Sequence, residues 1–321
     1  MQGPTNAGPG RREVESAAAL LSGVLSPTPL VPCAAPGGED LYLKLEVLQP
    51  TGSFKVRGVY HALARMDPGR RARGVATVSA GNTAKALAWA ARGFGVPARS
   101  LMPEHAPKAK VDAVRALGGT PVLVPMAEVF AHLRERRYER EPYAFVHPWT
   151  DRDVMTGHGT LALELCAELP DLDTVYVPVG GGGLLGGVGS ALKALKPSVR
   201  IVAVEPAGCP SFHAARAAGR PVEVACDTLC DGVAVPFITA EMFPLLTALA
   251  DASMLVSEEQ VKEAMRLLAQ KNHVVAEGSG ALAMAAALDE PRERRGVAVA
   301  LVTGGSIDLP KLAAILDPGR T

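Results

Sequence analysis

A lysine in the first quarter of the chain has a setting that suits covalent chemistry. Lys55 lies in "PTGSFKVRG", residues 50–58, directly after Phe54 and a Thr-Gly-Ser turn. A strand is predicted just before this turn, over residues 40–48. A surface lysine needs no such setting, whereas a nucleophilic lysine must lose its proton and be held in place. We therefore interpret Lys55 as a candidate for covalent catalysis.

A run of glycines forms a candidate phosphate site. In "TVYVPVGGGGLLGGVGSALKAL", residues 174–195, a predicted strand leads through Gly180, Gly181, Gly182 and Gly183 into a predicted helix. Without side chains in the way, several backbone N–H groups can point at one spot, with the positive end of the helix dipole behind them. No Gly-Lys-Ser/Thr follows, so the run is not a Walker loop, and a dinucleotide fingerprint is only weakly supported. A tight turn without a ligand remains the alternative.

Two further segments place polar groups at the ends of predicted strands. "SAGNTAKALAWAA", residues 79–91, has Ser79, Gly81 and Asn82 where a strand gives way to a helix. Exposed N–H groups there can hold a carboxylate, and the Asn82 amide can donate to a phenolate-like oxygen, although a plain helix cap is equally compatible. In "LVTGGSIDL", residues 301–309, Thr303 ends the last predicted strand. Ligands of such sheets gather beyond the carboxyl ends of the strands.

The elements that must position these residues alternate between strand-like and helix-like runs. Apolar runs such as "TVYVPV", "RIVAVEP" and "VAVALVTGG" are separated by amphipathic stretches, which is typical of an α/β protein with buried parallel strands. The chain has 321 residues, of which 48% are hydrophobic, enough for a large core and for two domains.

Composition disfavours several classes of partner. The formal net charge is zero, so neither nucleic acid nor an anionic membrane is indicated. No apolar run approaches the length of a membrane span. "RREVESAAALLSGVL", residues 11–25, contains Glu13 and Glu15 and is followed by prolines, so it predicts a short amphipathic helix rather than a signal peptide. We expect a cytoplasmic protein.

The cysteines indicate a reducing compartment. They are odd in number and show no Cys-x-x-Cys pair, so buried free thiols are predicted. Metal binding by Cys226 and Cys230 is the less favoured alternative. The full set is Cys33, Cys166, Cys209, Cys226 and Cys230.

A lysine, a phosphate cradle, an amide for a ring oxygen and a hydroxyl for a ring nitrogen together match the needs of pyridoxal 5′-phosphate. The sequence resembles the serine/threonine dehydratase family, pyridoxal-phosphate enzymes of fold type II that are similar to the tryptophan synthase β-subunit. The resemblance runs from "TPLVP" near residue 28 to "TGGSIDL" and includes "SFKVRG", "SAGN", "MTGHGT" and "GGGGL". It is greatest to a threonine dehydratase without a regulatory domain.

The resemblance implies a fold and an assembly. The fold would have two open, twisted, mainly parallel sheets with helices on both faces. Residues 1–69 and 149–321 would form a large cofactor-binding domain, and residues 70–148 a small domain. A homo-oligomer, specifically a dimer, is expected.

The resemblance also implies a role for each matching residue. Lys55 would bond the cofactor and, once released, act as the base. Asn82 would meet the cofactor's ring oxygen, and Thr303 its ring nitrogen. The implied cofactor contacts are Phe54, Lys55, Asn82, Gly180, Gly181, Gly182, Gly183, Leu184, Gly232, Glu277 and Thr303. The implied contacts of the substrate carboxylate are Ser79, Ala80, Gly81 and Asn82.

The implied activity is β-elimination, which converts a small L-hydroxy-amino acid such as L-threonine or L-serine to a 2-oxo acid and ammonia. A hydroxyl at the ring nitrogen, in place of a carboxylate, discourages a long-lived carbanion and so suits elimination. A β-replacing synthase of the same fold, a serine racemase and a non-enzymatic cofactor-binding protein are the alternatives. Serine racemases of the family have a serine where this sequence has Ala80, which makes racemisation less favoured.

The sequence departs from the family's pattern at three places. Thr83 follows the "SAGN" motif where histidine is usual, and His158 replaces a glutamine in "MTGHGT". After "VEP", Glu205 is kept, but Ser211 stands where relatives that bind a divalent ion have an acid. We therefore predict no metal site.

Overall fold

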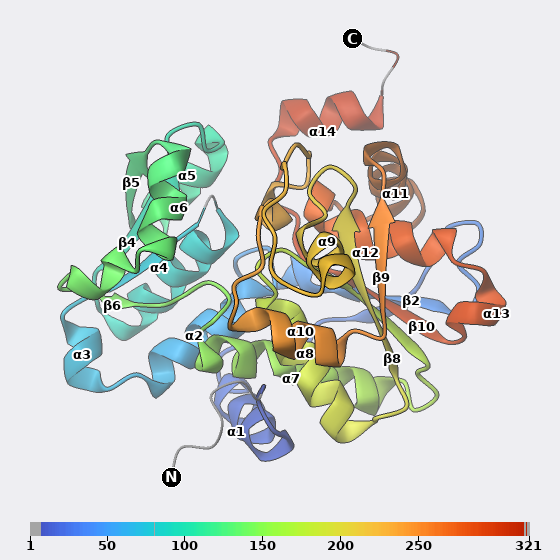
Figure 1. Cartoon of the computed structure of the whole chain (residues 1–321), viewed down its shortest axis with the longest axis horizontal. Helices are drawn as coiled ribbons and strands as arrows, with labels where there is room; N and C mark the ends of the chain where they lie inside the picture. Colours follow the sequence, from blue (N-terminus) through green and yellow to red (C-terminus); the bar gives the residue numbers. More distant parts are fainter. Residues whose placement is uncertain (1–7, 80, 318, 320–321) are drawn as a thin grey trace.

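The strands form two separate sheets (Figure 1) in the computed structural model, which describes residues 8–79, 81–317 and 319. The larger sheet has the order β1-β2-β10-β7-β8-β9, and the smaller has the order β5-β4-β3-β6. β1 is antiparallel to β2, and the other neighbouring pairs are parallel. The predicted α/β fold with two mainly parallel sheets is confirmed.

The predicted runs "TVYVPV", "RIVAVEP" and "VAVALVTGG" contain β7, β8 and β10. The strand predicted over residues 40–48 is shorter, because residues 46–48 form a 3₁₀ helix. The strands of the larger sheet are β1 (Leu30–Pro32), β2 (Leu41–Leu45), β7 (Thr174–Pro178), β8 (Arg200–Pro206), β9 (Ala252–Val256) and β10 (Ala298–Val302). In the smaller sheet they are β3 (Val75–Val78), β4 (Ala98–Pro103), β5 (Thr120–Val124) and β6 (Ala144–Phe145).

Helices accompany both sheets. Those at the left of Figure 1, with the smaller sheet, are α3 (Pro68–Ala72), α4 (Asn82–Phe94), α5 (Lys108–Ala116) and α6 (Met126–Arg134), together with the 3₁₀ turn η2 (Arg137–Arg140). The others are α1 (Arg11–Leu21), η1 (Glu46–Leu48), α2 (Lys55–Arg65), α7 (Arg152–Glu168), α8 (Gly183–Leu195), α9 (Ser211–Ala218), η3 (Asp231–Val233), α10 (Met242–Leu249), α11 (Glu258–Lys271), α12 (Gly278–Asp289), α13 (Arg292–Arg295) and α14 (Leu309–Leu316).

The larger sheet is buried on both faces. Along β7, Val175 and Val177 pack into one apolar cluster, whereas Tyr176 between them packs into another. Successive side chains of a strand point to opposite faces, so a continuous apolar run requires a cover on each side. This explains why the central strands lack the polar alternation of a half-exposed sheet.

The smaller sheet and its helices occupy one continuous stretch of the chain. They begin after α2 and end before α7. The carboxyl ends of β3, β7 and β10 lead into the segments that begin at Ser79, Val179 and Thr303. The domain boundaries at 69/70 and 148/149 stay a prediction.

Glycines allow α7 to pack directly against two neighbouring helices. A Cβ atom at Gly157 of α7 would lie 2.5 Å from the carbonyl oxygen of Arg57 and 2.7 Å from the Cα of Gly58, both in α2. On the other neighbour, a Cβ at Gly187 of α8 would collide with the carbonyl oxygen of Met155 in α7. The three helices therefore pack backbone against backbone. α2 begins with Lys55 and α8 begins at the glycine run, so α7 sets the spacing between them.

Buried ion pairs also hold α2 in place. The Arg57 guanidinium donates to Glu46 through Nε and Nη2, each at 2.8 Å, and to Glu164 of α7 at 2.5 Å. Arg57 and Glu46 are almost completely buried. Since unpaired buried charges are costly, these partners restrict where the first turn of α2 can lie.

We expect Gly157→Ala to destabilise the fold because the added methyl group must push α2 away. Overpacking of this kind typically costs about 1–3 kcal/mol of unfolding free energy. Gly93 near the end of α4 is the matched control, since a Cβ there meets nothing within 4 Å. Gly93→Ala should be neutral or raise the unfolding free energy by up to about 1 kcal/mol. Urea unfolding of both variants checks this; equal effects would contradict it.

Candidate active site

Lys55 is the first residue of α2 and is tied to the end of β10. The backbone N–H of Phe54 donates to the carbonyl oxygen of Thr303 at 3.1 Å, and Ser53 forms an isolated β-bridge with Gly304. These contacts join two segments far apart in the sequence. The Lys55 side chain consequently lines a cavity of about 330 Å³ at the carboxyl end of the larger sheet.

The surroundings of Lys55 favour the neutral amine. Burial lowers its pKa to about 8, and Glu277 opposes the shift only in part. His158 packs the edge of its ring against Phe54 at a centroid distance of 4.7 Å, and is fully buried. Burial first, then the neighbouring Lys55 and Arg57, keep the pKa of His158 well below its usual value. The imidazole is therefore neutral and places no charge beside the Lys55 amine.

The glycine run forms a cradle at the start of α8. Gly182 has φ of +94°, which side chains disfavour, and a Cβ there would collide with Leu246. Cβ atoms at Gly181 and Gly183 would meet Trp149, which packs behind the run. The first N–H groups of an α-helix lack partners within the helix, so they are available to an anion in the cavity.

The segment after β3 faces the same cavity. The backbone N–H of Gly81 donates to Ser79 Oγ at 3.1 Å. Asn82 Nδ2 donates to Glu277 Oε1 at 2.5 Å, whereas Asn82 Oδ1 is buried without a partner among the described residues. Ala80 lies outside the described residues. The Asn82 amide thus reaches the end of β10, since a Cβ at Gly304 would lie 3.2 Å from Asn82 Nδ2.

A hydrogen bond joins Thr303, directly after β10, to Ser279 in the first turn of α12. Thr303 Oγ1 donates to the carbonyl oxygen of Ser279 at 3.2 Å. Because a hydroxyl hydrogen rotates, Thr303 is able to turn this donor toward a ligand in the cavity instead. Ser279 Oγ is buried without a partner in the part of the chain that the structure describes. Gly232 packs against this hydroxyl, since a Cβ there would lie 2.9 Å from Ser279 Oγ.

The cavity brings together every described residue that the sequence predicted for the site. Its lining includes Phe54, Lys55, Ser79, Gly81, Asn82, Gly180, Gly181, Gly182, Gly183, Leu184, Gly232, Glu277 and Thr303. These residues come from both sheets. Their groups meet the needs of pyridoxal 5′-phosphate: an amine, a phosphate cradle, an amide and a hydroxyl.

Sequence reasoning missed a buried ion pair that crosses the cavity. Lys110 of α5 bonds Asp231 of η3 at 2.5 Å and lies 3.6 Å from Glu277. Burial lowers the pKa of Lys110, but Glu277 and Asp231 outweigh burial and raise it. Lys110 and Asp231 are 121 residues apart in sequence, and neither lies in a motif that signals the other. Trp149, which packs against the glycine run, was also missed, because no motif in the sequence links it to that run.

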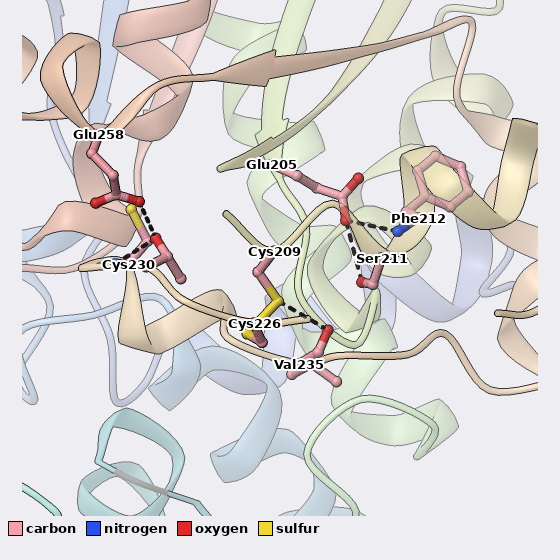
Figure 2. The surroundings of a disulfide bond; sticks show 9 residues. Glu205, Cys209, Ser211, Phe212, Cys226, Cys230, Val235 and Glu258 are labelled. Carbon is pink, nitrogen blue, oxygen red and sulfur yellow. Dashed lines mark hydrogen bonds between the residues drawn. A yellow bond between two sulfur atoms is a disulfide. The ribbon is translucent and has the colours of Figure 1, made fainter. Parts of the chain in front are cut away.

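The prediction of free cysteine thiols is wrong for two of them. Cys209 and Cys226 form a disulfide (Figure 2), because the backbone N–H of Asp227 donates to Gly208 and brings the two segments together. Cys33 and Cys230 are buried free thiols, and Cys166 is a partly exposed one. Cys226 is therefore not available to bind a metal with Cys230.

Glu205 lies near the end of strand β8 in "VEP", where relatives that bind a divalent ion have an acid nearby. Its carboxylate already has hydrogen-bond partners within the protein. The carboxylate accepts bonds from Ser211 Oγ and from the N–H group of Phe212 at the start of α9 (Figure 2). It also accepts a bond from the N–H group of His213. Burial raises its pKa to about 7. Among the described residues, no group of three or more metal-ligating side chains is found.

No helix in the described part of the chain is long and apolar enough to cross a membrane.

In the cofactor-free protein, we expect Lys55 to react with amine-directed reagents at unusually low pH. Only the neutral amine is nucleophilic, so labelling should reach half its maximum near pH 8, the value to which burial lowers its pKa. An ordinary lysine has a pKa of about 10.4. Mass spectrometry of labelled peptides measures this, with exposed Lys311 as the reference for reagent reactivity. A half-maximum for Lys55 above about 10 would contradict a desolvated amine.

Known proteins are similar to this chain in sequence and in structure. A family model described as "Pyridoxal-phosphate dependent enzyme" matches residues 21–304. The L-threonine ammonia-lyase of Thermotoga maritima is 40% identical over 287 residues, which cover 88% of this chain and 71% of that protein. Maize serine racemase has a similar structure, with a TM-score of 0.88, 31% identity and 96% of each chain covered. The processed form of threonine deaminase isoform 2 from Solanum lycopersicum is similar with a TM-score of 0.86 and 30% identity, over 99% of this chain and 96% of that one.

Proposed function

The chain belongs to the pyridoxal-phosphate dependent enzymes, and on that premise we propose that it deaminates a small L-hydroxy-amino acid by β-elimination. The substrate would resemble L-threonine or L-serine, and the products would be a 2-oxo acid and ammonia. The observation that carries this proposal is Lys55, a desolvated amine that lines one cavity with the glycine cradle and Asn82. Relatives named L-threonine ammonia-lyase and threonine deaminase support it.

The chain's own residues suit the cofactor. The N–H groups from Gly180 to Leu184 would hold its phosphate, and Phe54 would pack near the ring. Asn82 would meet the ring oxygen, and Thr303 would donate to the ring nitrogen by turning its hydroxyl hydrogen away from the Ser279 carbonyl, which leaves that nitrogen unprotonated. Gly232 leaves room beside the ring, and Glu277 orients the Asn82 amide.

Lys55 would move the proton that starts the reaction. When bound, the cofactor supplies an electron sink for the charge that develops at the substrate's α-carbon. With a pKa of about 8, Lys55 Nζ is able to accept the α-proton near neutral pH. The N–H groups of Ser79 and Gly81 are already bonded within the protein. The first N–H groups of α4, with the Asn82 side chain, would therefore hold the substrate's carboxylate in the orientation that presents this proton. The β-hydroxyl would then leave as water, with the proton that Lys55 Nζ has accepted supplying the hydrogen that this needs.

Racemisation is the second candidate, because the structure is similar to maize serine racemase. Returning a proton to the opposite face of the α-carbon needs a second acid. Position 80 is alanine, which has no proton to give; its placement lies outside the described residues. A β-replacing synthase would need a second nucleophile, and a cofactor-binding protein without turnover has no need of a desolvated Lys55.

We also propose a homodimer, and we propose the cytoplasm as its compartment because three of the five cysteines stay free thiols, against the one disulfide between Cys209 and Cys226. Leu48 and Val275 are 61% and 49% exposed, and both line a second cavity of about 510 Å³. Large apolar side chains grouped in this way mark interaction surfaces, and a second copy of the chain would cover them.

Reduction of the loaded enzyme with borohydride should fix the cofactor to Lys55. The expected result is one modified peptide, containing residue 55, by mass spectrometry. Lys55→Ala should lose the modification and the turnover while it keeps the circular dichroism of the native fold. Normal production of 2-oxo acid by Lys55→Ala would overturn the assignment of the base.

The unmodified enzyme should form 2-oxo acid from L-threonine or L-serine with little D-amino acid. Ala80→Ser should raise racemisation because serine supplies the missing acid. The increase should be at most about 10²–10⁴-fold, the contribution of one positioned acid/base group. A chiral assay run beside the oxo-acid assay measures both products. D-serine that forms as fast as pyruvate in the unmodified enzyme would favour the racemase instead.

A further inference from the structure

One wall of the active-site cavity comes from a single apolar helix face. Met126, Val129, Phe130 and Leu133 of α6 all line the cavity. Their spacing of three, four and seven residues puts them on one side of the helix. In a surface helix such a face would normally pack only against its own domain, but here it also faces the cavity that contains Lys55.

Charged groups of α6 do not reach this wall. Glu128 and Arg134 are exposed, and neither they nor His132 are among the cavity's lining residues in the described chain. The charged groups that line the cavity come from other elements, and Lys110, Asp231 and Glu277 bond one another there. His105 also lines the cavity but is exposed to solvent. The wall therefore offers hydrocarbon surface and no cation for a carboxylate.

The wall is held in place from outside the cavity. Phe130 packs edge-on against Phe237 with ring centroids 5.8 Å apart, and the Arg134 guanidinium lies over the same ring at 4.6 Å. Arg134 also bonds Glu223 at 2.6 Å, and Glu223 pairs with Phe237 through a β-bridge. α6 belongs to the smaller sheet, whereas Glu223 and Phe237 follow α9. These contacts hold the wall in place without a ligand.

We propose that the substrate carries an apolar group larger than methyl on its β-carbon, either a branched alkyl or a phenyl group. This inference rests on the proposed elimination and names the substrate class for it. The substrate would lose its α-proton and β-hydroxyl as water, and then take up water and release ammonia. The product is the 2-oxo acid that keeps the apolar group, phenylpyruvate from 3-phenylserine. The apolar group would lie against the α6 wall while Ser79 to Asn82 hold the carboxylate.

The test is a substrate panel with the loaded enzyme. Formation of 2-oxo acid is measured from L-serine, L-threonine, L-threo-3-hydroxyleucine and L-threo-3-phenylserine. The two larger substrates should have kcat/KM at least about 10-fold above that of L-serine, since one methylene in an apolar pocket is worth about 10–200-fold. Turnover of L-serine and L-threonine without the larger substrates would overturn the inference and leave the proposed function intact.

Wall variants connect the preference to α6. Phe130→Ala and Met126→Ala should each lower the ratio of kcat/KM for 3-phenylserine to kcat/KM for L-serine about 10-fold or more. Met126→Ala keeps the contact between Phe130 and Phe237, so it separates the wall's surface from its support. Glu128→Ala, on the exposed side of the same helix, is the matched control. Equal loss for both substrates in both wall variants would contradict a role in selectivity.

Binding without elimination separates this inference from the proposed function. L-Alanine, L-leucine and L-phenylalanine have no β-hydroxyl, and their binding is read from the absorbance of the bound cofactor. Tighter binding of L-phenylalanine or L-leucine than of L-alanine supports the wall even if no substrate of the panel is deaminated. Equal affinities for the three would overturn it. Absence of 2-oxo acid from all four panel members would by itself overturn only the elimination.

Discussion

The spacing between α2 and α8 depends on how closely both can approach α7. Glycines at the two contacts leave no side chain between the backbones, so the distance is set by backbone atoms rather than by flexible side chains. The amine of Lys55 and the glycine cradle are carried at the first turns of the two outer helices. A reaction that needs two groups at a fixed separation is well served by this arrangement, because backbone packing tolerates very little adjustment. His158, also in α7, is a neutral ring and places no charge beside Lys55.

Electrostatic contacts join the two sheets across the site. Asn82 and Lys110 come from the smaller sheet's helices, and Glu277 and Asp231 come from segments attached to the larger sheet. Each of these side chains has its partner on the other side. The polar part of the site is therefore complete only when both halves are in contact, whereas the glycine cradle and Lys55 belong to one half. A cation at Lys110 also balances two carboxylates, those of Asp231 and Glu277.

Local patterns made much of the site predictable. Consecutive glycines between a strand and a helix have few other uses, and a lysine after an aromatic residue in a turn is unusual on a surface. The parallel sheets followed from continuous apolar runs, and the resemblance to known enzymes ordered the motifs. Contacts between distant residues were not predictable, because no local signal links Lys110 to Asp231 or Cys209 to Cys226. The structure, and no part of the sequence analysis, shows that the apolar face of α6 lines a cavity.

The position of β10 has a consequence for folding during synthesis. This strand, Ala298–Val302, lies in the middle of the larger sheet, between β2 and β7. All the other strands leave the ribosome before it, so the sheet stays divided into two unpaired portions until the last part of the chain emerges. The turn before Lys55 finds its partners, Thr303 and Gly304, only at that moment. Pairing of segments so distant in sequence is slow. The edge of β2 therefore stays open for most of the synthesis, that of β7 opens from about its midpoint, and the lysine's surroundings assemble last.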